Sequence, residues 1–252
     1  MNEQLYIIEE NSLVSDIVAR DYRTADVFRK YDIDFCCGGK WALEMACKNK
    51  GLDTEAIVKE LQQTVRNISI SPVLPFNEWP LDFLADYIVY VHHAYLRRAF
   101  PEAKAHLDKF IAGHRKKYPY LDELEQQFLS LTRITIPHLK QEEETIFPYI
   151  KQVNRAAQNK EAYGGLLVRT LRKPVEEIMH FEHRTTSKIL HRFRELTNNY
   201  TPPENACISH RVTFLKLREL DRDLVQHMHL ENNILFPRAI AIEKELLGKN
   251  DR

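Results

Sequence analysis

The feature that most constrains this chain is a short motif that occurs twice. Residues 138–148 read HLKQEEETIFP and residues 227–237 read HMHLENNILFP. Each copy starts with a histidine, has a glutamate four residues later and ends on Phe-Pro, and positions four apart lie on the same face of a helix. One His-x-x-x-Glu pattern arises easily by chance on a solvated helix face. Two copies with the same Phe-Pro offset indicate a duplicated unit.

A single histidine lies upstream of each motif at nearly the same distance. His93 precedes His138 by 45 residues, and His183 precedes His227 by 44 residues. Each repeat therefore consists of one helix with a single histidine and one helix with His-x-x-x-Glu. Periodicity does not choose between His92 and His93, because each lies on an apolar face of its predicted helix. The chain thus predicts four helices that together carry four histidines and two glutamates.

An up-down four-helix bundle lets side chains from four helices converge on one buried point, and carboxylate-bridged di-metal centres are built in this way. The order His-x-x-x-Glu differs from the Glu-x-x-His of ferritin-like proteins and resembles a hemerythrin-like site. If Glu142 and Glu231 both bridge and each metal takes two histidines, each ion has four protein ligands. Imidazole and carboxylate suit iron, with manganese and zinc as competitors. An octahedral iron would then keep positions for an oxo or hydroxo bridge and a small ligand.

The overall composition excludes several classes of protein. The chain has 36 basic residues (Lys plus Arg) and 36 acidic residues (Asp plus Glu). It therefore lacks the excess of positive charge that would predict binding to nucleic acid. No stretch approaches the roughly twenty apolar residues that span a bilayer, and the first residues lack a signal-peptide pattern. We expect a cytoplasmic protein that does not enter a membrane.

The helical pattern predicts two domains, a small helical domain at residues 1–70 and a hemerythrin-like bundle at residues 80–247. In the first, apolar spacing predicts a helix over residues 12–31, a second over 41–48 ended by Gly51, and a third capped by Asp53 or Thr54. The segment 69–80 has three prolines and no helical period, which predicts a linker.

In the second domain the apolar pattern predicts four long helices and two connections. The helices are expected at 81–100, 120–151, 176–193 and 208–247, with a crossover at 156–174 and a loop at 196–207. We expect Pro137 to kink its helix just before His138. Pro148 and Pro237 should disturb their helices equivalently, one turn past each glutamate.

Cys36 and Cys37 are the cysteines with a candidate function. Adjacent side chains do not point at one ion, and a strain-free disulfide between neighbours is unlikely on geometric grounds. They precede Gly38, Gly39 and a helix expected to start near Lys40, so the helix N-terminus and the lysine would favour the thiolate. Reactive thiols and inert buried thiols both remain open.

The segments YDIDFCCGGK, HLKQEEETIFP, LTNNYTPPENAC and HMHLENNILFP together resemble the repair-of-iron-centres family of di-iron proteins. The likeness covers nearly the whole chain. It implies an N-terminal double-cysteine domain joined to a hemerythrin-like bundle with two non-haem iron ions, and a role in restoring iron-sulfur clusters damaged by nitric oxide or oxidants. Alignment with the family selects His93 over His92. The implied ligands are His93, His138, Glu142, His183, His227 and Glu231.

Two functions are compatible with these observations. In the first, the centre donates iron and binds or reduces nitric oxide, damaged iron-sulfur proteins are the partners, and Cys36 and Cys37 deliver iron or electrons. In the second, the protein is a reversible carrier or sensor of dioxygen or nitric oxide. Dioxygen carriers of the hemerythrin type have a fifth histidine and an aspartate ligand, which the motifs here do not supply, so we favour repair. Whether the chain turns over nitric oxide, whether it forms a homodimer, and what His92, His180 and Glu182 do stay open at this stage.

Overall fold

Helices are the only regular elements in the part of the chain that the computed structural model describes, residues 7–21, 23–35, 41–65, 74–171 and 175–249. The predicted all-α class is confirmed. The elements, with π-helical segments labelled η, are α1 (Val14–Arg20), α2 (Thr24–Lys30), α3 (Leu43–Asn49), α4 (Thr54–Val65), α5 (Leu81–Tyr87), η1 (Ile88–His93), α6 (Ala94–His114), α7 (Leu121–Gln141), η2 (Glu142–Ile146), α8 (Phe147–Gln158), α9 (Gly164–Leu171), α10 (Val175–Leu196), α11 (Ile208–Leu230), η3 (Glu231–Leu235) and α12 (Phe236–Lys249).

The prediction of one helix over residues 12–31 is wrong, because two short helices, α1 and α2, occupy this stretch. Asp21 has an extended backbone, its carboxylate accepts a hydrogen bond from the backbone N–H of Arg23, and its carbonyl accepts one from the Thr24 hydroxyl. These local bonds replace helical ones and break the helix. The predicted stop before Asp32 is correct, and Asp32 itself has a positive φ of 54°.

The helix predicted from residue 41 begins at Leu43. The predictions that Gly51 ends this helix and that Asp53 or Thr54 caps the next one agree with the structure. Gly51 has a φ of 66°, and its N–H donates to the carbonyl of Lys48, which ends α3. Asp53 caps α4 by accepting from the backbone N–H of Ala56 at 3.3 Å. Cys36 and Cys37 lie outside the described residues.

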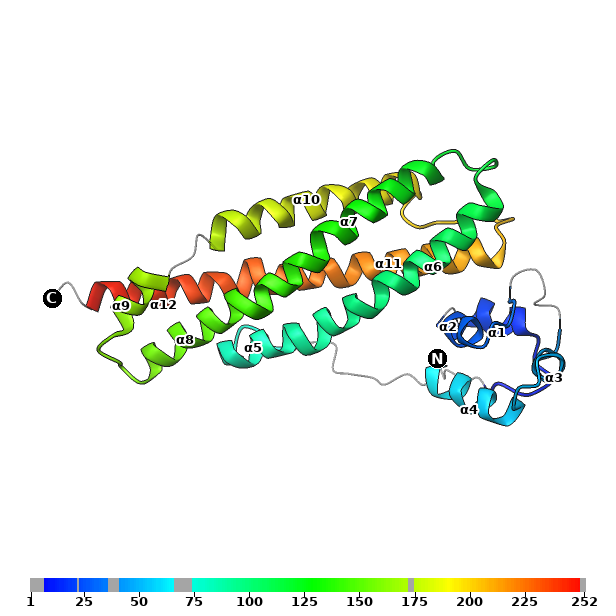
Figure 1. Cartoon of the computed structure of the whole chain (residues 1–252), viewed down its shortest axis with the longest axis horizontal. Coiled ribbons are helices and arrows are strands. Elements are labelled where there is room, and N and C mark those ends of the chain that lie inside the picture. Colours follow the sequence, from blue (N-terminus) through cyan, green and yellow to red (C-terminus); the bar gives the residue numbers. More distant parts are fainter. Residues whose placement is uncertain (1–6, 22, 36–40, 66–73, 172–174, 250–252) are drawn as a thin grey trace.

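Four long helical stretches form the bundle, with α5–η1–α6 first, then α7–η2–α8, α10 and α11–η3–α12 (Figure 1). The first stretch continues to His114 instead of ending at residue 100, because α6 runs through Pro101. The elements α6 and α11 pack together, as do α7 and α10, and α5 and α8. The duplicated sequence therefore yields the predicted bundle of helices.

The core of the bundle is divided into two apolar clusters. One cluster is built around Phe100, Phe128 and Phe193, and the other around Ile88 and Phe147. Along α5–η1–α6, α7–η2–α8 and α11–η3–α12 the candidate ligands lie near the boundary between the two clusters. The sequence thus places one polar layer in an otherwise apolar core, which isolates that layer from water.

Each Phe-Pro is preceded by a π-helical turn, η2 before Phe147-Pro148 and η3 before Phe236-Pro237. Proline lacks the N–H of an ordinary α-helical bond and its ring crowds the carbonyl four residues earlier, so a wider turn relieves both problems. The irregularities at Pro148 and Pro237 were predicted. Pro137 differs from the prediction, because α7 stays α-helical through it and the irregularity comes after His138.

The crossover between the repeats contains a short helix, α9, that the sequence did not predict. It packs on α12, and a Cβ on its first residue, Gly164, would lie 2.8 Å from Cδ2 of Leu246. A larger residue at this position would require the Leu246 side chain to shift, so the glycine allows close packing of α9 on α12.

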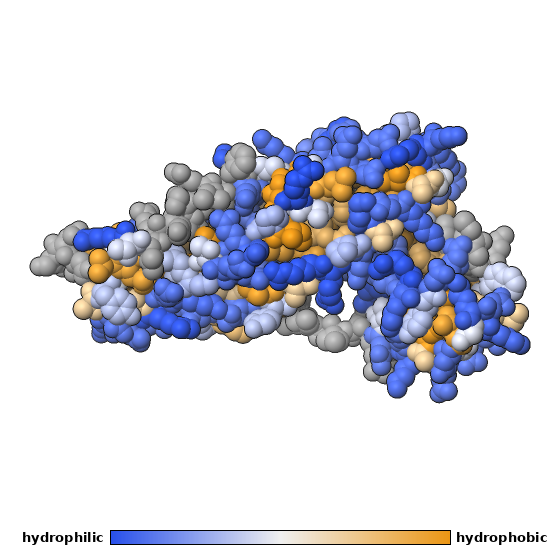
Figure 2. Space-filling model, viewed as in Figure 1, coloured by the Kyte–Doolittle hydropathy of each residue, from blue (hydrophilic) through white to orange (hydrophobic). Residues whose placement is uncertain are grey.

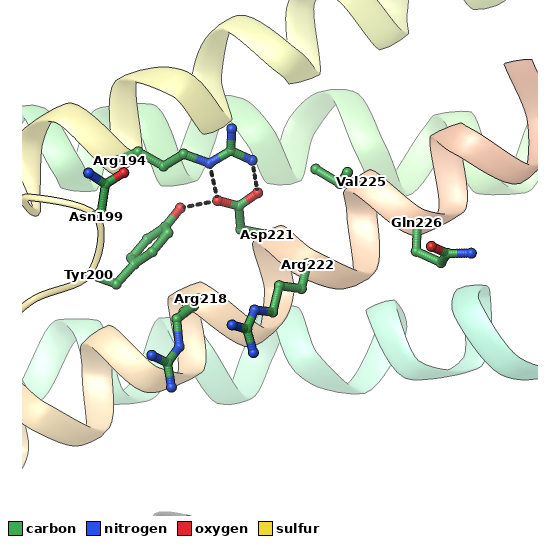
Figure 3. A pocket seen from close by; sticks show the side chains of 8 residues that line it. All are labelled: Arg194, Asn199, Tyr200, Arg218, Asp221, Arg222, Val225 and Gln226. Carbon is green, nitrogen blue, oxygen red and sulfur yellow. Dashed lines mark hydrogen bonds and ion pairs between the residues drawn. The ribbon is translucent and has the colours of Figure 1, made fainter. Parts of the chain in front are cut away.

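The loop after α10 is held to the bundle by a buried carboxylate. Asp221 accepts hydrogen bonds from the Arg194 guanidinium and, at 2.7 Å, from the Tyr200 hydroxyl (Figure 3). Asn198, Asn199 and Tyr200 all have positive φ, a conformation that asparagine tolerates better than most residues. Beside this cluster lies a cavity of about 300 Å³.

The N-terminal helices lie against the bundle where α6 ends and α11 begins (Figure 1). Val212 of α11 belongs to the same apolar cluster as Phe28 of α2. Asp26 accepts a hydrogen bond from Nε2 of His106 at 3.0 Å and pairs with Lys216. His106, which has no partner at metal-ligand spacing in the sequence, is therefore an interface residue.

The surface is polar on the face shown in Figure 2, with apolar residues in narrow strips between helices. Among the described residues, no helix combines the length and the low charge that crossing a membrane requires.

Candidate metal centre

Six side chains from the four long helical stretches meet in the polar layer between the two apolar clusters. Each of these side chains is at most 6% exposed. They are the six residues that the sequence predicts as ligands, His93, His138, Glu142, His183, His227 and Glu231.

The six side chains form two groups of four, and both glutamates belong to both groups. His93 and His227 complete one group, and His138 and His183 complete the other; within each group the candidate ligand atoms lie within 4.8 Å of one another. The Nε2 atoms of the two histidines face each other at 3.0 Å in the first group and 3.1 Å in the second. Two cation positions that share a pair of carboxylates follow from this geometry.

The carboxylate oxygens of the two glutamates are placed between the histidines. Oε1 of Glu142 lies 3.2 Å from Nε2 of His138, and its Oε2 lies 3.4 Å from Nε2 of His93. Oε1 of Glu231 lies 2.9 Å from Nε2 of His227, and its Oε2 lies 3.4 Å from Nε2 of His183. Each carboxylate therefore directs one oxygen to each group.

Burial sets the charge states of this layer. Burial and the neighbouring imidazoles lower the pKa of His93 and of His183 to about 3, and burial holds the pKa of His227 well below its ordinary value. These three rings are neutral at pH 7, which is the form in which a histidine nitrogen binds a metal.

The carboxylates show the opposite effect of the same burial. Burial and the nearby Glu231 raise the pKa of Glu142 well above its ordinary value, and burial raises the pKa of Glu231 to about 7. Burial opposes the charged form of His138 as well, but Glu142 and Glu182 outweigh it and raise the pKa of His138 to about 9. Two buried carboxylates in one layer therefore need positive charge beside them.

The residues present fit a pair of metal ions. All four oxygens of Glu142 and Glu231 are buried and lack a hydrogen-bond partner among the described residues. Buried carboxylates without partners are costly, whereas a bound cation satisfies both their charge and their lone pairs. The donor set of imidazole and carboxylate suits iron, manganese or zinc.

Three of the four histidines donate a hydrogen bond from their second ring nitrogen to an acceptor outside the ligand set. Nδ1 of His93 donates to Glu143 at 2.7 Å, and Nδ1 of His183 donates to Oδ1 of Asn232 at 2.9 Å. Glu143 follows Glu142 as Asn232 follows Glu231, so the repeat extends to these acceptors. Sequence reasoning missed both residues, although their shared position directly after each glutamate was visible.

Glu182 is the acceptor for the third histidine. Its carboxylate accepts from Nδ1 of His138 at 2.7 Å, and this bond lowers the pKa of Glu182. The sequence left the role of Glu182 open, and the structure places this partly exposed carboxylate on α10 where it faces His138 of the neighbouring helix α7. His229 contacts Asn233 and is not a member of either ligand group, and the side chain of His180 lies outside the described part of the chain.

π-helical turns carry three of the four pairs of adjacent residues that reach this layer, and the fourth pair, Glu182 and His183, lies on the regular helix α10. In an α-helix consecutive side chains diverge by about 100°, as 3.6 residues per turn require, and the wider π turn reduces that angle. The segment η1 ends on His92-His93, η2 starts with Glu142-Glu143 and η3 starts with Glu231-Asn232. Each of these π segments therefore carries one ligand together with a neighbour that also faces the site.

Comparison with known proteins gives matches over both parts of the chain. The model of the hemerythrin HHE cation binding domain matches residues 84–239. The model of ScdA_N, described as a domain of unknown function, matches residues 10–65.

Similar proteins match across nearly their whole length. The iron-sulfur cluster repair protein ScdA of Staphylococcus haemolyticus is 30% identical over 230 residues, which is 91% of this chain and 98% of that protein. The iron-sulfur cluster repair protein YtfE is 34% identical over 224 residues in both Citrobacter koseri and Escherichia coli O157:H7, covering 88% of this chain and 93% of each relative.

Proposed function

Because this chain belongs to the family of iron-sulfur cluster repair proteins that combine a ScdA_N domain with a hemerythrin HHE domain, we propose that it repairs damaged iron-sulfur clusters with a di-iron centre. The observation that carries the proposal is the pair of buried carboxylates shared by two histidine pairs. When bound, the iron pair supplies redox chemistry, exchangeable iron and a place for a small diatomic ligand such as nitric oxide.

The residues proposed as ligands divide into bridging and terminal positions. Glu142 and Glu231 would bridge the two ions. One ion would also be held by His93 and His227, and the other by His138 and His183. Four protein ligands for each ion leave room for a small exogenous ligand on an octahedral iron, which supports donation or ligand binding over a purely structural role.

The N-terminal helices would act with the bundle in repair. Cys36 and Cys37 are proposed as thiols that relay iron or electrons, with damaged iron-sulfur proteins as the partners. Phe35, the residue before them in sequence, is buried, and its ring centroid lies 6.1 Å from that of His106 on the bundle.

Metal analysis of protein purified without oxygen tests the di-iron proposal. We expect close to two iron per chain and, after oxidation, the absorption of a bridged diferric pair. A single zinc per chain with no iron would contradict it. Restoration of a nitrosylated iron-sulfur enzyme by the iron-loaded protein, but not by protein stripped of iron, tests the repair role.

A reversible carrier or sensor is the second candidate, because small ligands could bind the same iron pair. It predicts that the protein binds and releases nitric oxide without loss of iron and without restoring any damaged cluster. Iron content measured before and after incubation with a cluster-free acceptor protein separates the two functions.

A further inference from the structure

His92 lies outside the six-residue ligand set but is buried beside it, with one ring nitrogen unused. It is 5% exposed, and its Nδ1 donates a hydrogen bond to Oδ1 of Asp223 at 3.0 Å. Its Nε2 is buried and has no hydrogen-bond partner among the described residues. Because Nδ1 carries the proton, Nε2 presents a lone pair that can accept a hydrogen bond.

His227 has the complementary deficiency. Its Nε2 faces Glu231 at 2.9 Å, within the metal-ligand group, while its Nδ1 is buried and has no partner in the described part of the chain. A histidine that binds metal through Nε2 carries its proton on Nδ1 and ordinarily donates it to an outer acceptor. His93, His138 and His183 each have such an acceptor, which leaves His227 as the exception among the candidate ligands.

The internal repeat indicates which residue fills that role. Glu182 directly precedes His183, and it accepts the hydrogen bond of His138 from the other repeat. His92 directly precedes His93 in the equivalent position, so the repeat places it next to His227. The two rings are indeed neighbours, with centroids 6.1 Å apart and planes inclined by 39°.

We infer that His92 is a positioning residue for His227, as the middle member of a hydrogen-bonded chain from Asp223 through His92 to His227. This inference rests on the proposed metal centre. Asp223 accepts from Nδ1 of His92, and Nε2 of His92 accepts from Nδ1 of His227 after a small rotation of the two rings. This hydrogen-bonded chain gives each of the two buried nitrogens without a partner, Nε2 of His92 and Nδ1 of His227, a partner in the other.

The acceptors of His227 and of its repeat equivalent, His138, then differ in chemistry. One terminal histidine of the first position, His227, is oriented by a neutral imidazole, whereas the equivalent ligand of the second position, His138, is oriented by the carboxylate of Glu182. A carboxylate raises the basicity of its histidine more than an imidazole does. The other histidine of each position has the opposite kind of acceptor, since His93 donates to the Glu143 carboxylate and His183 donates to the Asn232 amide oxygen. Each position therefore combines one histidine oriented by a carboxylate with one oriented by a neutral group, and loss of the His92 acceptor should weaken the position of His227 alone.

Iron release from the full-length, iron-loaded protein into a strong chelator tests this inference. His92→Phe keeps a ring of similar size but removes the acceptor, so we expect two iron per chain on purification, with one of them released at least tenfold faster than in the parent. His92→Gln can place an amide oxygen near the position that Nε2 of His92 occupies in the parent, so its release rate should lie within about threefold of the parental rate. The tenfold effect expected for His92→Phe is in line with the 10–100-fold effects typical of outer-shell partners. Mössbauer spectra should show the change at only one of the two irons.

Two variants serve as controls. Tyr87→Phe alters the ring that packs on His92 at 5.6 Å and should leave both release rates unchanged. Glu182→Gln should labilise the other iron, the one held by His138. The inference is overturned if His92→Phe releases both irons at the parental rate, or if it is purified with one iron, which would make His92 a ligand. A parent protein without two iron would instead contradict the proposed function.

Discussion

At the residue scale, Glu142 and Glu231 differ from the four histidines because each belongs to both ligand groups. In the proposed centre a histidine would serve one ion, so its loss would weaken one position. A bridging glutamate would serve both ions and would also balance their charge in a buried layer. The two glutamates should therefore be the least replaceable members of the site.

Replacing Glu231 with glutamine tests this. The amide keeps the side-chain volume but loses the charge and one good metal-binding oxygen, so iron should fall from about two per chain to one or fewer. Glu143→Gln is the matched control, because Glu143 accepts from His93 without belonging to either ligand group, and it should keep two iron on purification. Two tightly held irons in Glu231→Gln would rule out a bridging role.

The double substitution of Cys36 and Cys37 by alanine separates the thiols from the iron centre. None of the six proposed ligands is a cysteine, so two iron should remain and nitric oxide binding should be unchanged. Repair of a nitrosylated iron-sulfur enzyme should be lost, measured with iron content matched to the parent. Loss of metal would make the thiols ligating or structural, and undiminished repair would remove them from the delivery path.

At the element scale, the π-helical turns link the Phe-Pro pairs to the metal layer. Pro148 and Pro237 lie immediately after η2 and η3, and each wider turn brings a ligand and its sequence neighbour to the same side of the helix. By favouring the π turns that carry Glu142 and Glu231, the prolines act on the site through backbone geometry.

Pro237→Ala should shift the balance between the π turn of η3 and an ordinary α-helical turn. Alanine restores the missing N–H and makes an ordinary α-helical turn competitive, so thermal stability should be unchanged or higher while iron release becomes roughly two- to tenfold faster. Pro101→Ala is the matched control, since Pro101 lies inside α6 away from any π segment, and it should not alter iron release. Equal release rates in the parent and in Pro237→Ala would show that packing, not proline, imposes the π turn.

At the scale of the whole molecule, an ion cluster joins the N-terminal helices to the bundle. Burial opposes ionisation of Asp26, but hydrogen bonds and charge from His106 and Lys216 outweigh it and lower the pKa of Asp26. A lowered pKa in the folded state means that the cluster stabilises the fold fully above the unfolded pKa of about 3.8 and loses that contribution as the pH falls through the lowered value.

Asp26→Asn should therefore destabilise the protein in a pH-dependent way. At pH 7 the free energy of unfolding in urea should fall by about 1.5–3 kcal/mol, the contribution typical of hydrogen bonds to a charged group. The difference from the parent should shrink in acid below about pH 3.8. Asp32→Asn, which removes an exposed ion pair with Lys50, should lower the free energy of unfolding much less than Asp26→Asn does. A constant difference at all pH values would exclude the ion cluster as its source.

The proposed division into domains at residues 1–70 and 80–247 predicts a protease-sensitive boundary. Cleavage should fall between residues 69 and 80, a segment whose first residues lie outside the described part of the chain and whose three prolines prevent helix formation. The C-terminal fragment should keep its iron, because all six proposed ligands follow residue 80. A fragment without iron would mean that the N-terminal helices supply a ligand.

The sequence by itself determined the helical class and predicted the bundle and five of the six candidate ligands, because a repeated spacing along a helix converts directly into a shared face. The choice of His93 over His92 needed the family resemblance. His138 with Glu142 and His227 with Glu231 needed no other information. It also located the irregularities at Pro148 and Pro237, since a proline alters its own helix. It did not locate the break at Asp21, where side-chain hydrogen bonds competed with the helix.

Only the tertiary structure decided what the neighbours of the ligands do. Glu182 and His138 are 44 residues apart on different helices, His92 and Asp223 are 131 residues apart, and Asp26 and Lys216 are 190 residues apart. Such contacts depend on how helices rotate and pack against each other, and an amphipathic pattern leaves that rotation undetermined within one face. A carboxylate beside a ligand looks the same in sequence whether it faces water or a histidine, and packing alone fixes which.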